Sequence, residues 1–272
     1  MENKKKEKTK IDIILPNYNS SQFIIRTIRS ILNQTYKNWK LIIVDDFSNK
    51  ETKKILKKFE NKKNIKIYWL KKNRGAGFCR NYAISLSSGD WITFLDQDDL
   101  YDQNRLNKIF NLINQNKRIN FFFHDTNYIN ETDQIISSHL YKYKLPFPQI
   151  NIKISTTLLL KYGSFIDSEA IAFKRSILNK VGKFDESLTY LCDYDFFLKV
   201  SFLYPFFYSK DKLSSWRMHK NQQQKTNKNQ KKERIRLFYK YLKNSNTDFK
   251  DKMYCLKTIF INLISIFKDN FR

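Results

Sequence analysis

The stretch WITFLDQDD, residues 91–99, places a short apolar run directly before a cluster of acids. The run follows a break at Gly89 and Asp90, so residues 91–95 are predicted to form a buried strand. Similar apolar runs on either side of this stretch predict strands at 11–15, 41–44, 65–70 and 120–123. Helical spacing of apolar residues predicts helices between them, at 24–34, 51–59, 75–87 and 106–113. This alternation predicts an α/β fold with a mainly parallel central sheet and helices on both faces.

Acidic side chains follow two of the predicted strands. Asp45 and Asp46 come after the strand at 41–44, and three acids lie within residues 96–99. Ligands of such sheets bind beyond the carboxyl ends of the strands, so both clusters are expected beside one crevice. Grouped carboxylates repel one another, and Mg²⁺-like ions are often shared between carboxylates and substrate phosphates. The acids therefore form either a metal-diphosphate site or an acidic turn in which Asp99 caps a helix, and the motif alone is too weak to favour the metal site.

The second half of the chain is less regular. Loops and hairpins are expected over 125–165, strands at 170–173 and 213–218, and helices at 176–181, 193–202, 235–242 and 253–267. The polar, basic stretch 221–233 is interpreted as an exposed linker. We therefore expect one domain over 1–220, made of a regular half (10–125) and a less regular half (126–220). A basic linker and a helical tail would follow at 221–272.

Composition narrows the class of protein. The 51 Lys and Arg against 26 Asp and Glu give a net charge of +25, which favours anionic partners, although an AT-rich gene would also enrich lysine. No groove-reading or base-stacking module is found, so nucleic acid is not expected as a partner. The three cysteines lack CxxC spacing, which argues against a disulfide scaffold or a zinc site. No signal peptide and no run of about 18–20 apolar residues is seen, so a cytoplasmic location is expected.

Eight short motifs occur in order along residues 10–219. They are IDIILPNYN (11–19), SILNQTY (30–36), VDDFS (44–48), NRG (73–75) with CRN (79–81), GDWI (89–92) with FLDQDD (94–99), FKR (173–175) with GKFD (182–185), DYD (193–195) and WRMH (216–219). Each is common alone, but their order resembles the bacterial-type, inverting family 2 glycosyltransferases. The resemblance implies the GT-A fold, with residues 10–125 as a Rossmann-like nucleotide-binding half and 126–220 as an acceptor half. It also implies transfer from a nucleotide diphosphate sugar, with UDP favoured.

The resemblance assigns five residues to the nucleotide. Asp46 would accept a hydrogen bond from the base, and Pro16 and Tyr18 would form the wall around base and ribose. Asp96 would contact the ribose. Arg80 is either a nucleotide contact or a solvated helix residue. The alternative for the residues assigned to the base is an ordinary capped turn between strand and helix.

The resemblance also implies a metal-assisted single displacement. Asp98 would bind Mn²⁺ or Mg²⁺ bridging the diphosphate, and His219 would approach the metal or diphosphate unless it is a plain surface histidine. Asp193 would be the base that removes the acceptor proton, its alternative role being an N-cap. The acceptor would be a glycan or a lipid-linked glycan. The donor sugar, the linkage and the oligomeric state stay open.

Two positions depart from the family pattern. Phe47 replaces a glycine, and because a side chain disfavours the left-handed conformation we expect a differently shaped turn. Cys192 replaces a glutamate and removes a charge beside Asp193. Neither change deletes a required group, so an active enzyme is expected. The alternatives are an inactive homologue acting as a binding subunit, or a nucleotidyltransferase, which the segment 17–21 disfavours because it lacks a Gly-rich basic loop.

The predicted tail helix at 253–267 is amphipathic. Thr258, Asn262, Ser265 and Asp269 form a polar stripe opposite a broad apolar face, with lysines at both ends. Such a helix lies on anionic lipid or packs on the domain or on a second subunit. A peripheral position on the cytoplasmic face of a membrane is therefore expected.

Overall fold

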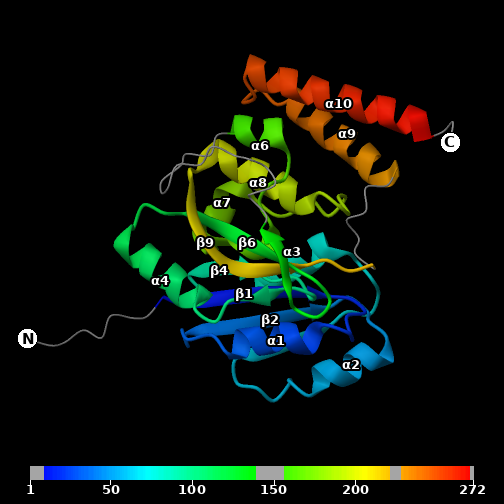
Figure 1. Cartoon of the computed structure of the whole chain (residues 1–272). Coiled ribbons are helices and arrows are strands. Elements are labelled where there is room, and N and C mark those ends of the chain that lie inside the picture. Colours follow the sequence, from blue (N-terminus) through cyan, green and yellow to red (C-terminus); the bar gives the residue numbers. More distant parts are fainter. Residues whose placement is uncertain (1–8, 139–155, 221–227, 270–272) are drawn as a thin grey trace, which may run out of the picture.

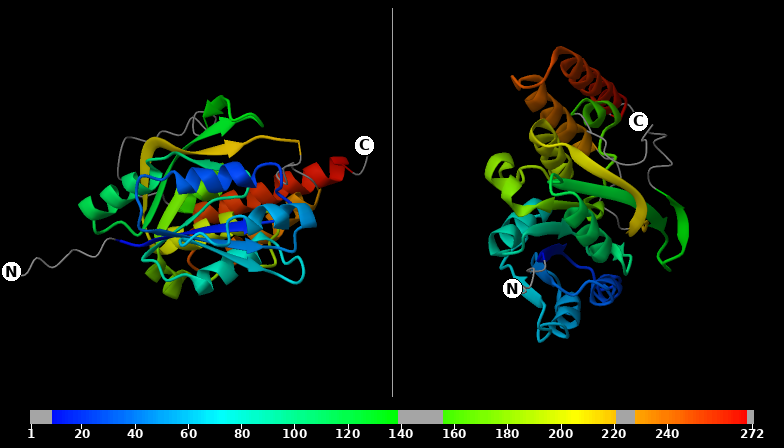
Figure 2. Two further views of the ribbon diagram at one scale, coloured as in Figure 1. Left: turned by 90° about the horizontal axis from the view of Figure 1, so that it is seen from below. Right: turned by 90° about the vertical axis from the view of Figure 1, so that its left-hand side faces the viewer.

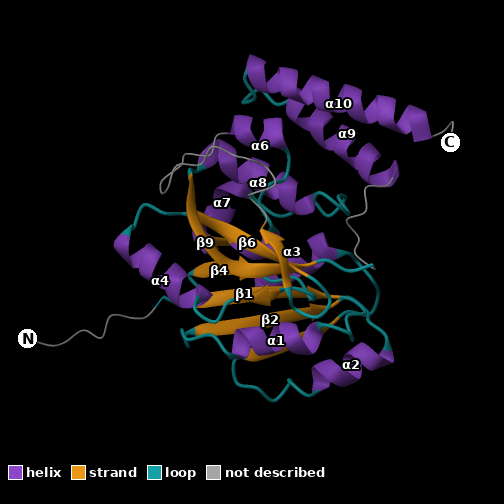
Figure 3. Cartoon of the chain, in the orientation of Figure 1, coloured by secondary structure: helices purple, strands orange, loops and turns teal. Residues whose placement is uncertain are grey.

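A computed structural model of the chain describes residues 9–138, 156–220 and 228–269. Within these ranges one central sheet lies between helices (Figures 1 and 3). The strands run in the order β3 (Ile65–Trp69), β2 (Trp39–Asp45), β1 (Ile11–Asn17), β4 (Trp91–Phe94), β8 (Ile171–Lys174), β6 (Phe121–Ile129), β9 (Phe206–Arg217) and β5 (Leu100–Tyr101), with β7 (Ile135–Ser138) paired to β6.

Six of the nine strands in the described sheet point the same way, which agrees with the predicted mainly parallel sheet, while β8, β5 and β7 run antiparallel to their neighbours. Strands β3, β2, β1 and β4 pair in parallel, and β6 pairs in parallel with β9. Strand β8 is antiparallel to both β4 and β6, so β6 keeps the direction of β4. The carboxyl ends of β1, β2 and β4 consequently meet at one edge of the sheet, where Asp45, Asp46 and Asp96 follow.

Alternating side chains of the strands feed two separate apolar layers. Ile14 and Phe94 belong to one layer, and Ile13 and Leu15 belong to the other, as expected for a strand with both faces covered. The first layer is covered by α3 (Ala76–Leu86), α6 (Thr156–Tyr162), α7 (Leu178–Val181) and α8 (Cys192–Leu203). The second is covered by α1 (Ile24–Leu32), α2 (Lys50–Lys57) and α4 (Arg105–Gln115).

Several element boundaries differ from the sequence predictions. Strand β1 continues through Pro16 and Asn17, both buried, so the expected turn begins one residue after Asn17. Strand β9 has 12 residues rather than six because it pairs along the whole of β6. The region expected to hold only hairpins and loops contains α6.

The tail forms two helices that lie side by side over α6 and α8 (Figures 1 and 2). Helix α9 (Lys228–Leu242) begins within the stretch interpreted as an exposed linker, and that interpretation is wrong at Glu233, which is buried. The rest of the linker, 221–227, lies outside the described residues. Helix α10 (Phe249–Asp269) turns Asn262 of its polar stripe inward, and Asp269 pairs with Lys231 of α9.

The outer side of α10 is apolar. Its exposed apolar side chains are Phe249, Met253, Leu256, Phe260, Ile261, Leu263, Ile264 and Phe267. Lys250, Lys257 and Lys268 are exposed among them, while Asp251, Cys255 and Asn262 are buried against the protein. The helix therefore leaves a broad apolar face uncovered, whereas an ordinary surface helix presents a polar face to solvent. In the described ranges, no helix is long and apolar enough to cross a membrane.

Candidate active site

Asp46 joins two turns at the end of β2. Its carboxylate is 4% exposed and accepts hydrogen bonds from the backbone N–H groups of Arg74 at 2.6 Å and Gly75 at 2.8 Å. Gly75 has φ 84°, a conformation that glycine adopts without the Cβ penalty, and α3 begins at the next residue. These contacts fix the orientation of Asp46 at the sheet edge.

Phe47 contradicts the expectation of a differently shaped turn. It has φ 65°, so the residue adopts the left-handed conformation despite its Cβ. Its ring is 53% exposed and lies near the ammonium of Lys53, 5.0 Å from the ring centre. Tyr18, in the facing turn, is 43% exposed, and its backbone N–H donates to Gln97. Two exposed aromatic rings therefore follow β1 and β2, while Pro16 is buried within β1.

Arg80 of α3 is buried beneath the acidic loop, which excludes the interpretation as a solvated helix residue. Its guanidinium donates to Asp96 at 2.9 Å and to the sulfur of Cys192 at 3.4 Å. The second oxygen of Asp96 accepts from the hydroxyl of Ser168 at 2.9 Å. Burial raises the pKa of Cys192 to about 12, so the thiol stays protonated where the family pattern has a carboxylate. Arg80 thus connects Asp96 of the nucleotide half to the start of α8.

The imidazole of His219 reaches the acidic loop. Its Nε2 lies 2.8 Å from Oδ2 of Asp98, and both side chains are mostly buried. Arg217, at the end of β9, brings the two together, since its Nε donates to the Asp98 carbonyl at 2.7 Å and its backbone N–H donates to Asp99 at 2.8 Å. The ring of His219 also packs on Phe23. The interpretation of His219 as a plain surface residue is therefore wrong.

Asp193 lies in the first turn of α8. The helix begins at Cys192 with Leu191 at its cap position, so Asp193 is not the N-cap. Its carboxylate accepts from the backbone N–H of Tyr194 at 2.7 Å. Burial raises the pKa of Asp193, while the nearby charge of Arg80 lowers it. A half-buried carboxylate of raised basicity beside the acidic loop has the properties of a general base.

Two further acids of the site had no sequence signal. Asp167 and Glu169 flank Ser168 in the turn before β8, a segment without periodicity or motif. Burial raises the pKa of Asp167 to about 8, and the charges of Asp193 and Asp96 raise it as well. Burial also raises the pKa of Glu169 well above its usual range, as does neighbouring Asp167. The crossing of β8 between β4 and β6 brings these acids to the site.

The side chains at the acidic loop fit a divalent cation that is completed by substrate. Among the residues that the structure describes, no three side chains form a metal site made by protein alone. Asp98 and His219 do provide a carboxylate oxygen and an imidazole nitrogen within 2.8 Å of each other. These two side chains are of the kinds that could hold a divalent cation such as Mn²⁺ or Mg²⁺.

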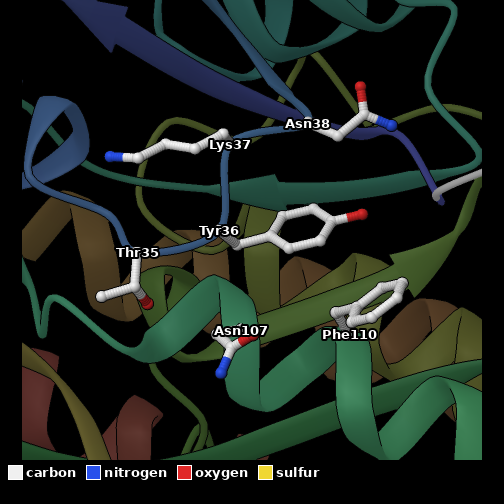
Figure 4. A pocket seen from close by; sticks show the side chains of 6 residues that line it. All are labelled: Thr35, Tyr36, Lys37, Asn38, Asn107 and Phe110. Carbon is white, nitrogen blue, oxygen red and sulfur yellow. The ribbon is translucent and has the colours of Figure 1, made fainter.

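A cavity elsewhere in the fold is not part of this constellation. It has a volume of about 590 Å³ and lies between the segment before β2 and α4, at the amino-terminal edge of the sheet (Figure 4). It is lined by Thr35, Tyr36, Lys37, Asn38, Asn107 and Phe110. No carboxylate lines it, and it lies at the sheet edge opposite Asp46 and Asp98. The acidic edge is therefore the candidate active site.

The chain matches the family model of glycosyl transferase family 2 over residues 12–182. It belongs to glycosyltransferase family 2. An uncharacterized glycosyltransferase of Rickettsia typhi is 32% identical over 238 residues, which cover 86% of this chain and 71% of that protein. The family resemblance seen in the ordered motifs is thereby confirmed, and membership favours glycosyl transfer over nucleotidyl transfer.

Solved structures confirm the GT-A fold of this family 2 glycosyltransferase. The Staphylococcus aureus TarS fragment 1–349 in complex with UDP-GlcNAc superposes with a TM-score of 0.71 at 18% identity, covering 93% of this chain and 71% of that one. The mannosyltransferase PcManGT of Pyrobaculum calidifontis, in complex with GDP-Man and Mn²⁺, gives a TM-score of 0.66 at 14% identity. It covers 96% of this chain and 73% of that one.

Proposed function

We propose that this enzyme transfers a sugar from a nucleotide diphosphate sugar to a hydroxyl of a glycan or lipid-linked glycan, with inversion at the anomeric carbon. The observation that carries the proposal is the gathering of five groups at one sheet edge. They are the carboxylates of Asp46, Asp96, Asp98 and Asp193 and the imidazole of His219.

The donor half would hold the nucleotide. Asp46 is held rigidly at the sheet edge and would accept a hydrogen bond from the base, while Tyr18 offers an exposed ring beside it. Asp96 would contact the ribose, and Arg80 would hold Asp96 in place from beneath. UDP is the preferred nucleotide, which agrees with the UDP-GlcNAc complex of TarS.

Asp98 and His219 would hold Mn²⁺ or Mg²⁺, and the Mn²⁺ complex of PcManGT supports such a cation. When bound, the cation would neutralise negative charge on the departing diphosphate. The chain contributes by keeping both ligands in place: Arg217 ties Asp98 to the end of β9, two residues before His219.

Asp193 would act as the base in a single displacement. It takes the proton of the acceptor hydroxyl while that oxygen bonds to the anomeric carbon of the donor. The bond from this carbon to the diphosphate oxygen breaks, and its electron pair leaves with the nucleoside diphosphate. One displacement inverts the configuration, so an α-linked donor would give a β-linked product. The raised pKa of Asp193 improves its competence as a proton acceptor.

The tail supports a peripheral position on the cytoplasmic face of a membrane, where a lipid-linked acceptor would lie. Eight apolar side chains are exposed along α10. Residues 228–269 carry eleven Lys and Arg against four Asp and Glu. An apolar helix face bordered by basic residues is typical of interfacial helices on anionic lipid.

The test of the proposed reaction is Asp193→Asn. It should keep the affinity for UDP with Mn²⁺ but lower the rate of transfer at least about a hundredfold, since general-base catalysis contributes about 10²–10⁴-fold. Asp211→Asn, a half-buried acid paired with Lys108 outside the site, is the matched control and should keep full activity. An Asp193→Asn variant that transfers sugar normally would contradict the assignment of the base. Loss of nucleotide binding in every variant and in the parent would favour the inactive homologue.

A further inference from the structure

The turn before α8 is held by a carboxylate from the tail. Glu233 of α9 is 7% exposed and accepts hydrogen bonds from three successive backbone N–H groups, those of Thr189 at 2.8 Å, Tyr190 at 2.7 Å and Leu191 at 2.7 Å. No side chain caps α8 locally. The first N–H groups of a helix lack intrahelical partners, and negative charge is favoured near them. Glu233 binds the N–H groups of the turn that leads into α8, up to its cap residue Leu191, and places a negative charge near the start of the helix from more than 40 residues away.

A second attachment lies on the other side of Asp193. The carboxylate of Asp195, which is fully buried, accepts from the ammonium of Lys240 at 2.8 Å and from the hydroxyl of Tyr241 at 2.9 Å. Lys240 is seven residues after Glu233, so both lie on the same side of α9. Lys199 of α8 also pairs with Asp195, at 3.2 Å.

The two attachments enclose the proposed base. Glu233 binds the backbone of residues 189–191, which end two positions before Asp193. Lys240 and Tyr241 bind Asp195, two positions after it. Between these two attachments, the carboxylate of Asp193 accepts a hydrogen bond from the backbone N–H of its neighbour Tyr194. The place of this carboxylate therefore depends on where α9 sets the first turn of α8.

We propose that Glu233 is a positioning residue for catalysis, which makes α9 a working part of the active site rather than an appended tail. The inference rests on the proposed role of Asp193. Replacing one oxygen of Glu233 by an amide nitrogen removes an acceptor for at least one of the three N–H groups. The first turn of α8 then loosens, and misplacing a catalytic group by about 1 Å can cost about a hundredfold in rate.

The test compares Glu233→Gln with Lys231→Gln. Lys231 lies on the same helix and pairs with Asp269 of α10, without a role at α8. The probe reaction is release of UDP from UDP-GlcNAc or another UDP-sugar that the enzyme turns over, with water as acceptor. Glu233→Gln should lower kcat roughly tenfold with unchanged UDP affinity, and amide hydrogen exchange should accelerate over residues 189–195. Lys231→Gln should change neither. Equal kcat and equal exchange in the parent and Glu233→Gln would overturn the proposal.

A double variant separates this inference from the proposed function. If Glu233 acts through Asp193, adding Glu233→Gln to Asp193→Asn lowers the residual rate no further, whereas independent effects would multiply. An active Asp193→Asn variant contradicts the base assignment. An inactive Asp193→Asn beside a fully active Glu233→Gln contradicts the positioning role alone. Should Glu233→Gln fail to fold, Lys240→Gln tests the other attachment at a side chain that is 46% exposed, with the same readouts.

Discussion

Nε2 of His219 lies 2.8 Å from Oδ2 of Asp98, although the two residues are 121 positions apart in the chain. The contact exists because β9 pairs along β6 and ends beside the acidic loop, where Arg217 binds Asp98 and Asp99. The end of β9 thus meets the acidic loop that follows β4.

Replacing His219 should weaken metal-dependent nucleotide binding. His219→Gln is expected to lower UDP affinity in the presence of Mn²⁺ at least about tenfold, because the ion loses one of its two protein ligands. Binding without Mn²⁺ should not change, and neighbouring Met218→Leu serves as the control, since Met218 is 43% exposed. Isothermal titration with UDP measures both. Unchanged Mn²⁺-dependent affinity would remove His219 from the site.

The rate of transfer should fall in mildly acidic solution. Burial raises the pKa of Asp193, and only its charged form accepts a proton, so activity decreases as pH falls through that raised pKa. The midpoint of kcat/KM should lie above about 3.9, the ordinary value of an aspartate. Arg80 lowers this pKa, so Arg80→Gln should move the midpoint to higher pH. A flat profile down to pH about 4 would contradict the role of Asp193.

Arg80→Gln should also destabilise the fold. The guanidinium is buried and paired with Asp96, and breaking a buried pair leaves an uncompensated charge. Because the Asp96 side chain is one-third exposed, we expect a loss of about 2 kcal/mol, or a Tm lower by about 4–8 °C. Arg74→Gln, at an exposed arginine, should lie within about 0.5 kcal/mol of the parent. Equal melting of both variants would show that Arg80 contributes little.

The outer face of α10 should govern membrane association. Phe260→Ser with Phe267→Ser, both at exposed positions, should reduce sedimentation with vesicles of anionic phospholipid by at least tenfold, because two large apolar groups are removed from the interface. Leu203→Ser, at a residue that is 51% exposed at the end of α8, is the control. Unchanged vesicle binding would contradict the lipid assignment. A shift from dimer to monomer in the double variant would instead identify a second copy as the partner.

The nucleotide half could be predicted from local pattern because each strand there is a short apolar run with polar breaks on both sides. The second half depends on long-range pairing, which local pattern does not encode. Strand β9 is extended by β6 over residues such as Ser209 and Lys212 that have no strand signal of their own. The start of α9 is polar and basic, so its burial at Glu233 follows only from N–H partners in a distant turn.

The residues of the site also divide into those that local sequence pattern predicts and those that depend on long-range contacts. Its acids at Asp46, Asp96, Asp98 and Asp193 stand in recognisable motifs at strand or helix ends. The backbone conformation of Phe47 could not be foreseen, because the surrounding hydrogen bonds hold the turn against the preference of its side chain. Asp167 and Glu169 carry no local signal, since their importance arises from the neighbours that β8 brings to them.

The proposed metal-assisted nucleotide site is tested most directly by the thermal stability of the enzyme with UDP. The measurement is made with and without Mn²⁺, for the parent and for Asp98→Asn. A ligand that binds only the folded state at a hundredfold excess over its Kd adds about 2.7 kcal/mol of stability. We expect a large Mn²⁺-dependent rise in Tm for the parent and its loss in Asp98→Asn. An equal rise in both proteins, or none in the parent with UDP, GDP or other nucleoside diphosphates, would contradict a metal-assisted nucleotide-sugar site at this edge of the sheet.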